Sequence, residues 1–259
     1  MSDEITNLIE TRDDGVLVLT LNRPERLNAM DGALMRALND AVRRAAGDAE
    51  IGCVVLTGAG GAFSAGGDMK AAAVARGEGE KPPERPPQSF EARVAWLKRS
   101  MEAARLLHDM SKPTIAMISG ACAGAGMSLA GACDLRYADQ SARFTTAFAR
   151  AGLSGDYGGS WFWTRILGTA KARELYLLSE KLDAQQALAA GVVSAVYPEE
   201  ELTERVMEIA RRLAAGPRAA YGYMKRNLNA AEAGRMDEVF DLEAMTMLLS
   251  RQALSASKR

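Results

Sequence analysis

Cysteine and histidine are scarce in this chain, and their scarcity excludes several kinds of active site. Of 259 residues, three are cysteine and one is histidine, and no CxxC or HExxH pattern occurs. The sequence therefore indicates no metal site and no catalytic triad that depends on histidine. The cysteines, Cys53, Cys122 and Cys133, are odd in number and lie in apolar stretches, which is typical of reduced, buried thiols in a cytoplasmic protein.

An excess of charge and a long apolar run are absent as well. The formal net charge is −1, which provides no overall attraction to nucleic acid or to an anionic membrane. No uninterrupted stretch of about 18 apolar residues predicts a transmembrane helix, and residues 1–4 lack the basic and apolar regions of a secretory signal. We therefore expect neither nucleic acid nor a membrane as a partner.

The features that stand out instead are two glycine-rich turns. Residues 64–68 (Ser-Ala-Gly-Gly-Asp) follow the apolar run 53–56, and residues 124–126 (Gly-Ala-Gly) follow the apolar run 114–118. Each run predicts a buried strand. Each turn predicts the start of a helix, where backbone N–H groups lack partners and attract negative charge. Two such groups aimed at one point form an oxyanion hole, which stabilises a developing negative charge.

Strands and helices alternate through most of the chain. Runs 5–10 and 16–21 flank Asp-Asp-Gly and predict a β-hairpin. Asp31 is expected to cap the next helix, and a longer helix over 90–110 ends near His108, whose charge would suit a helix C-terminus. The buried face of the helix after Asp31 is predicted to be Leu34, Leu38, Ala41, Val42 and Ala45. This alternation favours an α/β fold with a parallel sheet.

Two regions depart from that alternation. Residues 77–87 are rich in proline and glycine, and predict a surface loop or a lid. From residue 199 onward, every segment is predicted to be helical. With no strand left to cover, these last helices need another surface for their apolar faces, part of which could belong to a neighbouring subunit.

Five motifs follow one another along the chain. They are residues 21–29 (LNRPERLNA), 63–68 (FSAGGD), 112–126 (KPTIAMISGACAGAG), 152–168 (GLSGDYGGSWFWTRILG) and 190–193 (AGVV). Each motif is weak alone, but the ordered set is specific. It resembles the crotonase superfamily, also called the enoyl-CoA hydratase/isomerase family.

The resemblance implies a fold, a substrate class and an assembly. The fold would be an α/β spiral of repeated ββα units over residues 1–198, followed by a C-terminal helical trimerisation region over 199–259. The chain would form a homotrimer or a dimer of trimers. Its substrate would be an acyl-CoA thioester of fatty acid metabolism, with no cofactor other than the CoA that the substrate carries.

The resemblance also implies roles for individual residues. The N–H groups of Gly67 and Ala125 would form an oxyanion hole for a thioester enolate. Ala125 stands where the family usually has glycine, but alanine keeps the N–H. The candidates for CoA binding are Ala65, Asp68, Met69 and Lys70, which match the stretch around adenine and pantetheine, with Arg26, Lys70 and Lys225 for the phosphates.

The chain departs from the family pattern at its acid/base residues. Ser128 and Phe148 stand where hydratases of the family have two glutamates. Asp156 falls where other branches, the dienoyl-CoA isomerases and an aryl-CoA dehalogenase, use an aspartate. From the residues alone, Asp156 between Gly155 and Gly158 could equally be a turn residue. Nearby aromatic residues could line an acyl pocket or fill the core: Trp161, Phe162, Trp163, Phe144 and Phe148.

A single carboxylate limits the chemistry. Asp156 can take a proton from one carbon of a thioester enolate and return it to another, which favours an isomerase. Hydration of a 2-enoyl-CoA is the alternative, and it needs a positioned water as well. A hypothesis of another class is an acyl-CoA-binding paralogue with little catalysis, which the missing glutamates would explain.

Overall fold

The structure is a computed structural model that describes residues 6–68 and 89–256. Its main feature is a six-stranded sheet in the order β1-β2-β3-β4-β6-β9. The strands are β1 (Leu8–Asp13), β2 (Val16–Leu21), β3 (Cys53–Gly58), β4 (Thr114–Ile118), β6 (Leu135–Asp139) and β9 (Ala195–Tyr197). Only the pairing of β1 with β2 is antiparallel. The predicted α/β class with a parallel sheet is confirmed.

A second, smaller sheet explains the repeating units. It has the order β5-β7-β8, with β5 (Ala121–Ala123), β7 (Arg143–Thr145) and β8 (Leu182–Asp183). Strand β4 of the large sheet leads into β5 and then helix α5 (Ala125–Ala132). Likewise β6 leads into β7, the 3-10 turn η2 (Ala149–Ala151) and helix α6 (Gly159–Leu178). The chain thus alternates between the two sheets in ββα units, as expected.

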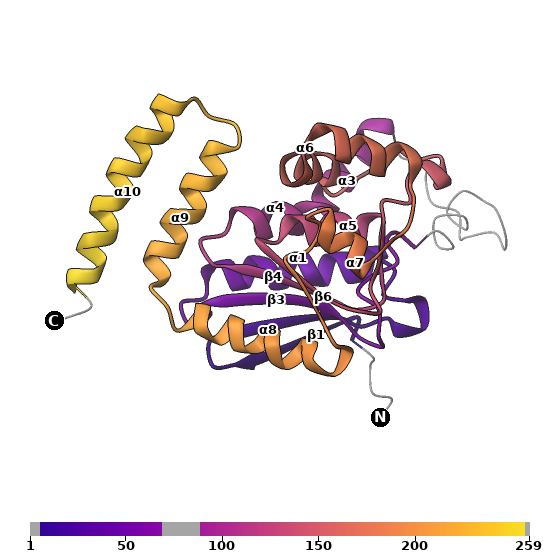
Figure 1. The fold of residues 1–259 in the computed structure, drawn as a ribbon, viewed down its shortest axis with the longest axis horizontal. Coiled ribbons are helices and arrows are strands. Elements are labelled where there is room, and N and C mark those ends of the chain that lie inside the picture. Colours follow the sequence, from indigo (N-terminus) through magenta and orange to yellow (C-terminus); the bar gives the residue numbers. More distant parts are fainter. Residues whose placement is uncertain (1–5, 69–88, 257–259) are drawn as a thin grey trace.

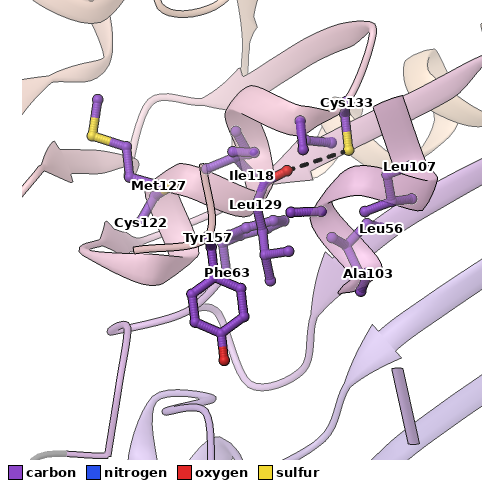
Figure 2. Packing of buried hydrophobic residues seen from close by; sticks show 14 of the residues in the cluster. Leu56, Phe63, Ala103, Leu107, Ile118, Cys122, Met127, Leu129, Cys133 and Tyr157 are labelled. Carbon is purple, nitrogen blue, oxygen red and sulfur yellow. Dashed lines mark hydrogen bonds between the residues drawn. The ribbon is translucent and has the colours of Figure 1, made fainter. Parts of the chain in front are cut away.

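Helices cover both faces of the large sheet (Figure 1). Helices α1 (Gly32–Gly47), α4 (Glu102–Asp109) and α5 pack on one face, where the main apolar cluster lies, and α7 (Ala184–Ala189) joins the same cluster. Figure 2 shows part of this cluster, including Leu56, Phe63 and Leu107. Helix α8 (Glu199–Ala214) covers the other face through a separate cluster with Val16, Val55 and Ile115.

Local signals in the sequence place the first elements well. Asp31 caps α1, and its carboxylate accepts hydrogen bonds from Ala33 N at 3.0 Å and Leu34 N at 2.8 Å. The predicted face of α1 is buried throughout. The first strand runs over 8–13 rather than 5–10, because Asp14 and Gly15 alone form the turn, both with positive φ, so that Asp13 pairs with Val16.

The predicted single helix over 90–110 is wrong. The chain forms α3 (Phe90–Ser100) and then α4, which meet at Met101. The buried side chain of Asn39 explains the break. Its Nδ2 donates to Arg99 O at 2.9 Å, and its Oδ1 accepts from Ala103 N at 2.6 Å. A side chain inserted between these two backbone groups replaces their helical hydrogen bond.

The three C-terminal helices differ from one another. Contrary to expectation, α8 does find sheet to cover. Helices α9 (Arg218–Ala231) and α10 (Met236–Ala256) extend away from the rest of the molecule (Figure 1), and apolar side chains on them are exposed, including Leu228 at 66% and Phe240 at 61%. The predicted boundary at 198/199 stays a prediction, as does the trimer. Segment 77–87 lies outside the described residues.

The described part of the chain contains no helix long and apolar enough to cross a membrane. No group of three or more described histidine, cysteine or acidic residues could hold a metal ion. The three cysteines are free and buried, and burial raises the pKa of Cys53 and of Cys133 to about 12. These thiols therefore stay protonated and serve as small core groups.

Candidate active site

The two glycine turns lie side by side. Ser64 N donates to Ala121 O at 2.8 Å, and Ala123 N donates to Ser64 O at 2.9 Å. Gly66 has a φ of 93°, and a Cβ added to it would lie 2.8 Å from Ala123 O and 3.3 Å from Ala125 N. Only glycine allows this backbone conformation and this close approach. The first turn therefore touches the N-terminus of α5 directly.

Two backbone N–H groups at this contact have no acceptor within residues 6–68 and 89–256. Met30 N donates to Gly66 O at 2.7 Å and Asp68 N donates to Met30 O at 3.1 Å, but Gly67 N, between them, has no hydrogen bond to a described residue. Ala125 is the first residue of α5, so its N–H has no partner inside the helix either. A Cβ on Gly67 would meet no atom within 4 Å. Two such groups can hold an oxyanion; that these two do so stays a prediction.

Buried side chains hold the first turn in place. Asn28 is fully buried with a φ of 55°. Its Nδ2 donates to Ala59 O at 2.8 Å and to Ala62 O at 2.6 Å, and its Oδ1 accepts from Arg23 N at 2.9 Å. Ser64 Oγ donates to Asn28 O at 2.8 Å and accepts from Gly66 N at 3.1 Å. The backbone that carries Gly67 is thus braced by satisfied hydrogen bonds.

The residues expected to bind CoA are distributed around this turn. The carboxylate of Asp68 is only 8% exposed and lies 3.1 Å from the Arg23 guanidinium, so its charge is partly neutralised from within the protein. Ala65 N donates to Leu27 O at 2.8 Å. Arg26 is exposed at the end of the 3-10 turn η1 (Pro24–Arg26). Met69 and Lys70 lie outside the described residues. All five CoA contacts stay predictions.

Lys225 does not have the position expected of a phosphate ligand. Its ammonium is buried beneath α9 and lies 2.7 Å from the Asp134 carboxylate. It also donates to Leu107 O at 3.2 Å and to Lys112 O at 3.0 Å. Three acceptors satisfy the three N–H groups of a lysine. The interpretation of Lys225 as a CoA ligand is therefore wrong, and the residue anchors α9 to the core.

Asp156 lies on the loop between η2 and α6. The loop has an irregular backbone, with φ of 111° at Gly155, 50° at Tyr157 and 73° at Gly158. Asp156 Oδ1 is buried and has no hydrogen-bond partner among the described residues. Burial raises the pKa of Asp156 from 3.8 to about 6, and no other described charged group contributes to that shift. A buried carboxyl with such a pKa is a candidate general base.

Tyr176, which the sequence patterns did not indicate, lies against the Asp156 loop. Its ring stacks on Phe148 with 5.9 Å between centroids. Its hydroxyl is also buried; it forms no hydrogen bond of normal geometry with a described residue, but it interacts with Ser128. Ser128 lies beside it on α5 and donates from Oγ to Gly124 O at 3.3 Å. Tyr176 is twenty residues after Asp156 in a helical pattern, so no local motif could have connected the two.

The aromatic residues divide into two groups. Phe144 and Trp163 are fully buried core residues. Trp161 and Phe162 line a cavity of about 450 Å³ that reaches the residues following Asp156. Also lining it are Tyr157, Gly158, His108 and Asp109. His108 stands in the last turn of α4, and its ring meets Trp161 edge to face. This volume suits an organic group of modest size.

Comparison with known proteins finds enzymes of CoA thioesters, both with a family model and with individual sequences. The family model for enoyl-CoA hydratase/isomerase matches residues 11–257. The 1,2-epoxyphenylacetyl-CoA isomerase of Escherichia coli is 36% identical over 89% of this chain and 85% of its own. The 4-chlorobenzoyl coenzyme A dehalogenase-1 of an Arthrobacter species is 31% identical over 92% and 83%.

Solved structures agree with the sequence comparison. An enoyl-CoA hydratase from Polaromonas sp. JS666 superimposes with a TM-score of 0.83 at 31% identity, covering 93% of this chain and 90% of its own. The crotonase-like fold is thereby confirmed. Because the family model spans nearly the whole chain and the relatives are enzymes of CoA thioesters, this chain belongs to the enoyl-CoA hydratase/isomerase family and is a CoA thioester enzyme.

Proposed function

We propose that the protein is an isomerase that moves a proton between two carbons of an acyl-CoA through a thioester enolate. The N–H groups of Gly67 and Ala125 hold the thioester oxygen as it becomes negative. Asp156 removes a proton from one carbon and returns it to another. The observation that carries this proposal is the partly buried carboxyl of Asp156, whose pKa is raised to about 6 by burial alone.

A pKa of about 6 suits this task. The carboxylate is ionised at neutral pH, so it can accept a proton, and its conjugate acid is acidic enough to release the proton again. A shuttle needs no second acid or base, because the same group performs both steps. The enolate between the steps is stabilised by fixed N–H dipoles that need not reorganise during the reaction. The relative named as an isomerase supports the same class of chemistry.

The rest of the substrate and the assembly follow from the same proposal. Ala65, Asp68, Met69, Lys70 and Arg26 contact the CoA portion, and the acyl group enters the cavity beside Trp161. The exposed apolar faces of α9 and α10 are covered by neighbouring copies in a homotrimer or a dimer of trimers, because monomers rarely leave apolar areas of that extent in water. No cofactor is required.

Replacement of Asp156 by Asn tests the proposal. We expect the exchange of the α-proton of an acyl-CoA into heavy water to fall by about 10²- to 10⁴-fold, since general base catalysis typically contributes that much. The matched control is Asp40→Asn, which removes an exposed carboxylate on α1 and should leave exchange unchanged. Undiminished exchange in the Asp156 variant would refute the role. Tight thioester binding without exchange in the wild type would favour a binding paralogue instead.

Hydration of a 2-enoyl-CoA is the second candidate. The hydroxyl of Ser128 is the observation that favours it, because this group lies at the α5 N-terminus beside the site and has lone pairs left to orient a water. A solved structure similar to this chain is named as an enoyl-CoA hydratase. Water addition to crotonyl-CoA by the wild type, reduced at least tenfold in Ser128→Ala, would support this function over isomerisation.

A further inference from the structure

Helix α6 folds back on itself and so brings Tyr176 to the Asp156 loop. The helix is interrupted at Gly168, whose φ of 76° and ψ of 162° are not helical. As a result its two ends meet. A Cβ placed on Gly159, the first residue of α6, would lie 2.4 Å from the Tyr176 hydroxyl. An uninterrupted helix would hold residues 159 and 176 about 25 Å apart, at 1.5 Å per residue.

The Tyr176 side chain spans the segment that carries Asp156. A Cβ placed on Gly155 would lie 3.1 Å from Tyr176 Cε1, and the hydroxyl of the same ring reaches Gly159. One residue before Asp156 and three residues after it, the loop is therefore in contact with a single tyrosine. Phe148 stacks on that ring and also lies against Gly155, where an added Cβ would be 3.7 Å from its ring atoms.

Two buried polar atoms in this region lack partners, and they are complementary. Asp156 Oδ1 is an acceptor and the Tyr176 hydroxyl is a donor, and neither has a hydrogen bond to a described residue. Leaving either atom unpaired in the interior is costly. The negative charge of Asp156 adds to burial in raising the pKa of Tyr176 to about 12, so the hydroxyl keeps its proton and remains a donor.

The other polar groups around Asp156 have interactions of their own. Tyr157 follows it in the loop, and both its burial and the Asp156 charge raise its pKa to about 12, but its hydroxyl interacts with Ser100 instead. Ser128 on α5 donates to Gly124 O at 3.3 Å and also interacts with the Tyr176 hydroxyl, which opposes the rise in the pKa of Tyr176. No described cation contributes to the pKa of Asp156. A hydroxyl that accepts from Ser128 keeps its own O–H, so Tyr176 still has a donor to offer the carboxyl.

We propose that Tyr176 is a positioning residue for Asp156: its hydroxyl donates a hydrogen bond to the ionised carboxylate and so orients the base towards the acyl carbon. This inference rests on the proposed function. Gly155 and Gly158, both with positive φ, give the loop the freedom to bring the two atoms together once the carboxylate carries its charge. The hydrogen bond is made to the charged form, which it therefore stabilises.

Tyr176→Phe tests this role, with Tyr137→Phe as the matched control. Tyr137 stands on β6, beside Tyr197 on the α8 side of the sheet, so its hydroxyl is remote from the loop. Loss of the donor should raise the pKa of Asp156 by about half a unit to one unit, measured by carbon-13 NMR titration of labelled aspartate. The acid limb of α-proton exchange should move up by the same amount. The kcat should fall about three- to tenfold, while KM stays unchanged.

The outcomes separate this inference from the proposed function. Phenylalanine keeps the shape of the ring, and Ser128, the hydroxyl beside Tyr176, keeps its hydrogen bond to Gly124 O, so Tyr176→Phe should fold normally. An unchanged or lowered Asp156 pKa in this variant would overturn the positioning role, even if Asp156→Asn abolishes exchange. An Asp156 pKa that rises as expected, in an enzyme whose exchange does not depend on Asp156, would instead overturn the proposed function and keep the contact.

Discussion

The glycine turns and the Asp156 loop belong to the proposed site but are held in opposite ways. Around the first turn, Asn28 and Ser64 satisfy the backbone with hydrogen bonds, and the Gly67 N–H has no acceptor among the described residues. Around the loop, Asp156 Oδ1 and the Tyr176 hydroxyl are buried and form no hydrogen bond of normal geometry within the described part of the chain. Hydrogen bonds thus hold the backbone of the first glycine turn in place, whereas the Asp156 loop contains buried polar atoms that lack them.

The difference corresponds to the two tasks of an enolate enzyme. Fixed dipoles are most effective when they do not reorganise as charge develops, so rigid support favours an oxyanion hole. A proton shuttle needs a carboxyl with a pKa closer to neutrality, and a polar group without compensating hydrogen bonds has that property. The hydrogen bonds around the first glycine turn therefore add to the stability of the fold, whereas the polar atoms of the Asp156 loop that lack hydrogen bonds reduce it.

The sharpest way to break this comparison is to remove one donor from the braced region. Ala125→Pro deletes the N–H at the first position of α5, where proline is well tolerated. Gly124 before it has a φ of 52° and a ψ of −124°, an extended conformation that only glycine adopts easily. We expect kcat for α-proton exchange to fall by about 10²- to 10³-fold, the usual effect of losing one oxyanion donor.

Ala125→Gly is the control for this prediction. It keeps the N–H and removes only the methyl group, so kcat should stay within about threefold, and the cost in helix stability should be at most about 1 kcal/mol. Circular dichroism and thermal unfolding of both variants would establish that α5 still forms. Full activity in a folded Ala125→Pro protein would exclude the Ala125 N–H from the oxyanion hole.

A second prediction concerns the bracing itself. Asn28→Ala removes two donors and one acceptor from the interior, leaving Ala59 O, Ala62 O and Arg23 N without their partner. It also places alanine at a φ of 55°. Unpaired buried groups and the left-handed backbone should together lower the free energy of unfolding by about 2–4 kcal/mol.

The matched control is Asn22→Ala, which removes one exposed hydrogen bond from Nδ2 to Thr6 O. Urea unfolding at equal protein concentration should show a loss of no more than about 1 kcal/mol for this variant. If both asparagines cost the same, the first glycine turn is not braced more firmly than the surface, and the comparison between the two regions fails.

The sequence predicted what depends on neighbouring residues and missed what depends on residues brought together by the fold. Asp31 caps a helix through its own backbone neighbours, so the prediction was confirmed. The break between α3 and α4 depends on Asn39, about sixty residues earlier, and periodicity could not indicate it. The burial of Lys225 against Asp134 depends on where α9 contacts the core.

The residues of the candidate site show the same contrast between local sequence motifs and contacts made by the fold. Gly67 and Ala125 could be proposed from the sequence because each glycine turn is a continuous motif, and Asp156 because of its place in a motif. Tyr176 could not, because it reaches the Asp156 loop only through the interruption at Gly168. An interrupted helix and a continuous one have nearly the same pattern of apolar residues, so the sequence does not distinguish them.

The smallest expected effect concerns the Asp156 loop. Here a substitution should raise the free energy of unfolding rather than lower it. The pKa of Asp156 in the folded chain is about 6 against an ordinary value of 3.8, so folding favours the protonated form. Above pH 6 the carboxylate is ionised in both states, and the folded chain bears the cost of burying its charge. Below about pH 4 it is protonated in both states, and that cost disappears. Asp156→Asn carries no charge at any pH.

We therefore expect Asp156→Asn to be more stable than the wild type by about 1–3 kcal/mol at pH 8, taking 1.36 kcal/mol for each unit of pKa shift. The gain should shrink as the pH falls through 6 and vanish near pH 4. Urea unfolding at both pH values measures it, with Asp40→Asn on the surface of α1 as the control. A variant less stable than the wild type at pH 8 would mean that interactions beyond a Tyr176 hydrogen bond hold the carboxylate in place. Asp156 would then be a turn residue, and the two regions of the site would be braced alike.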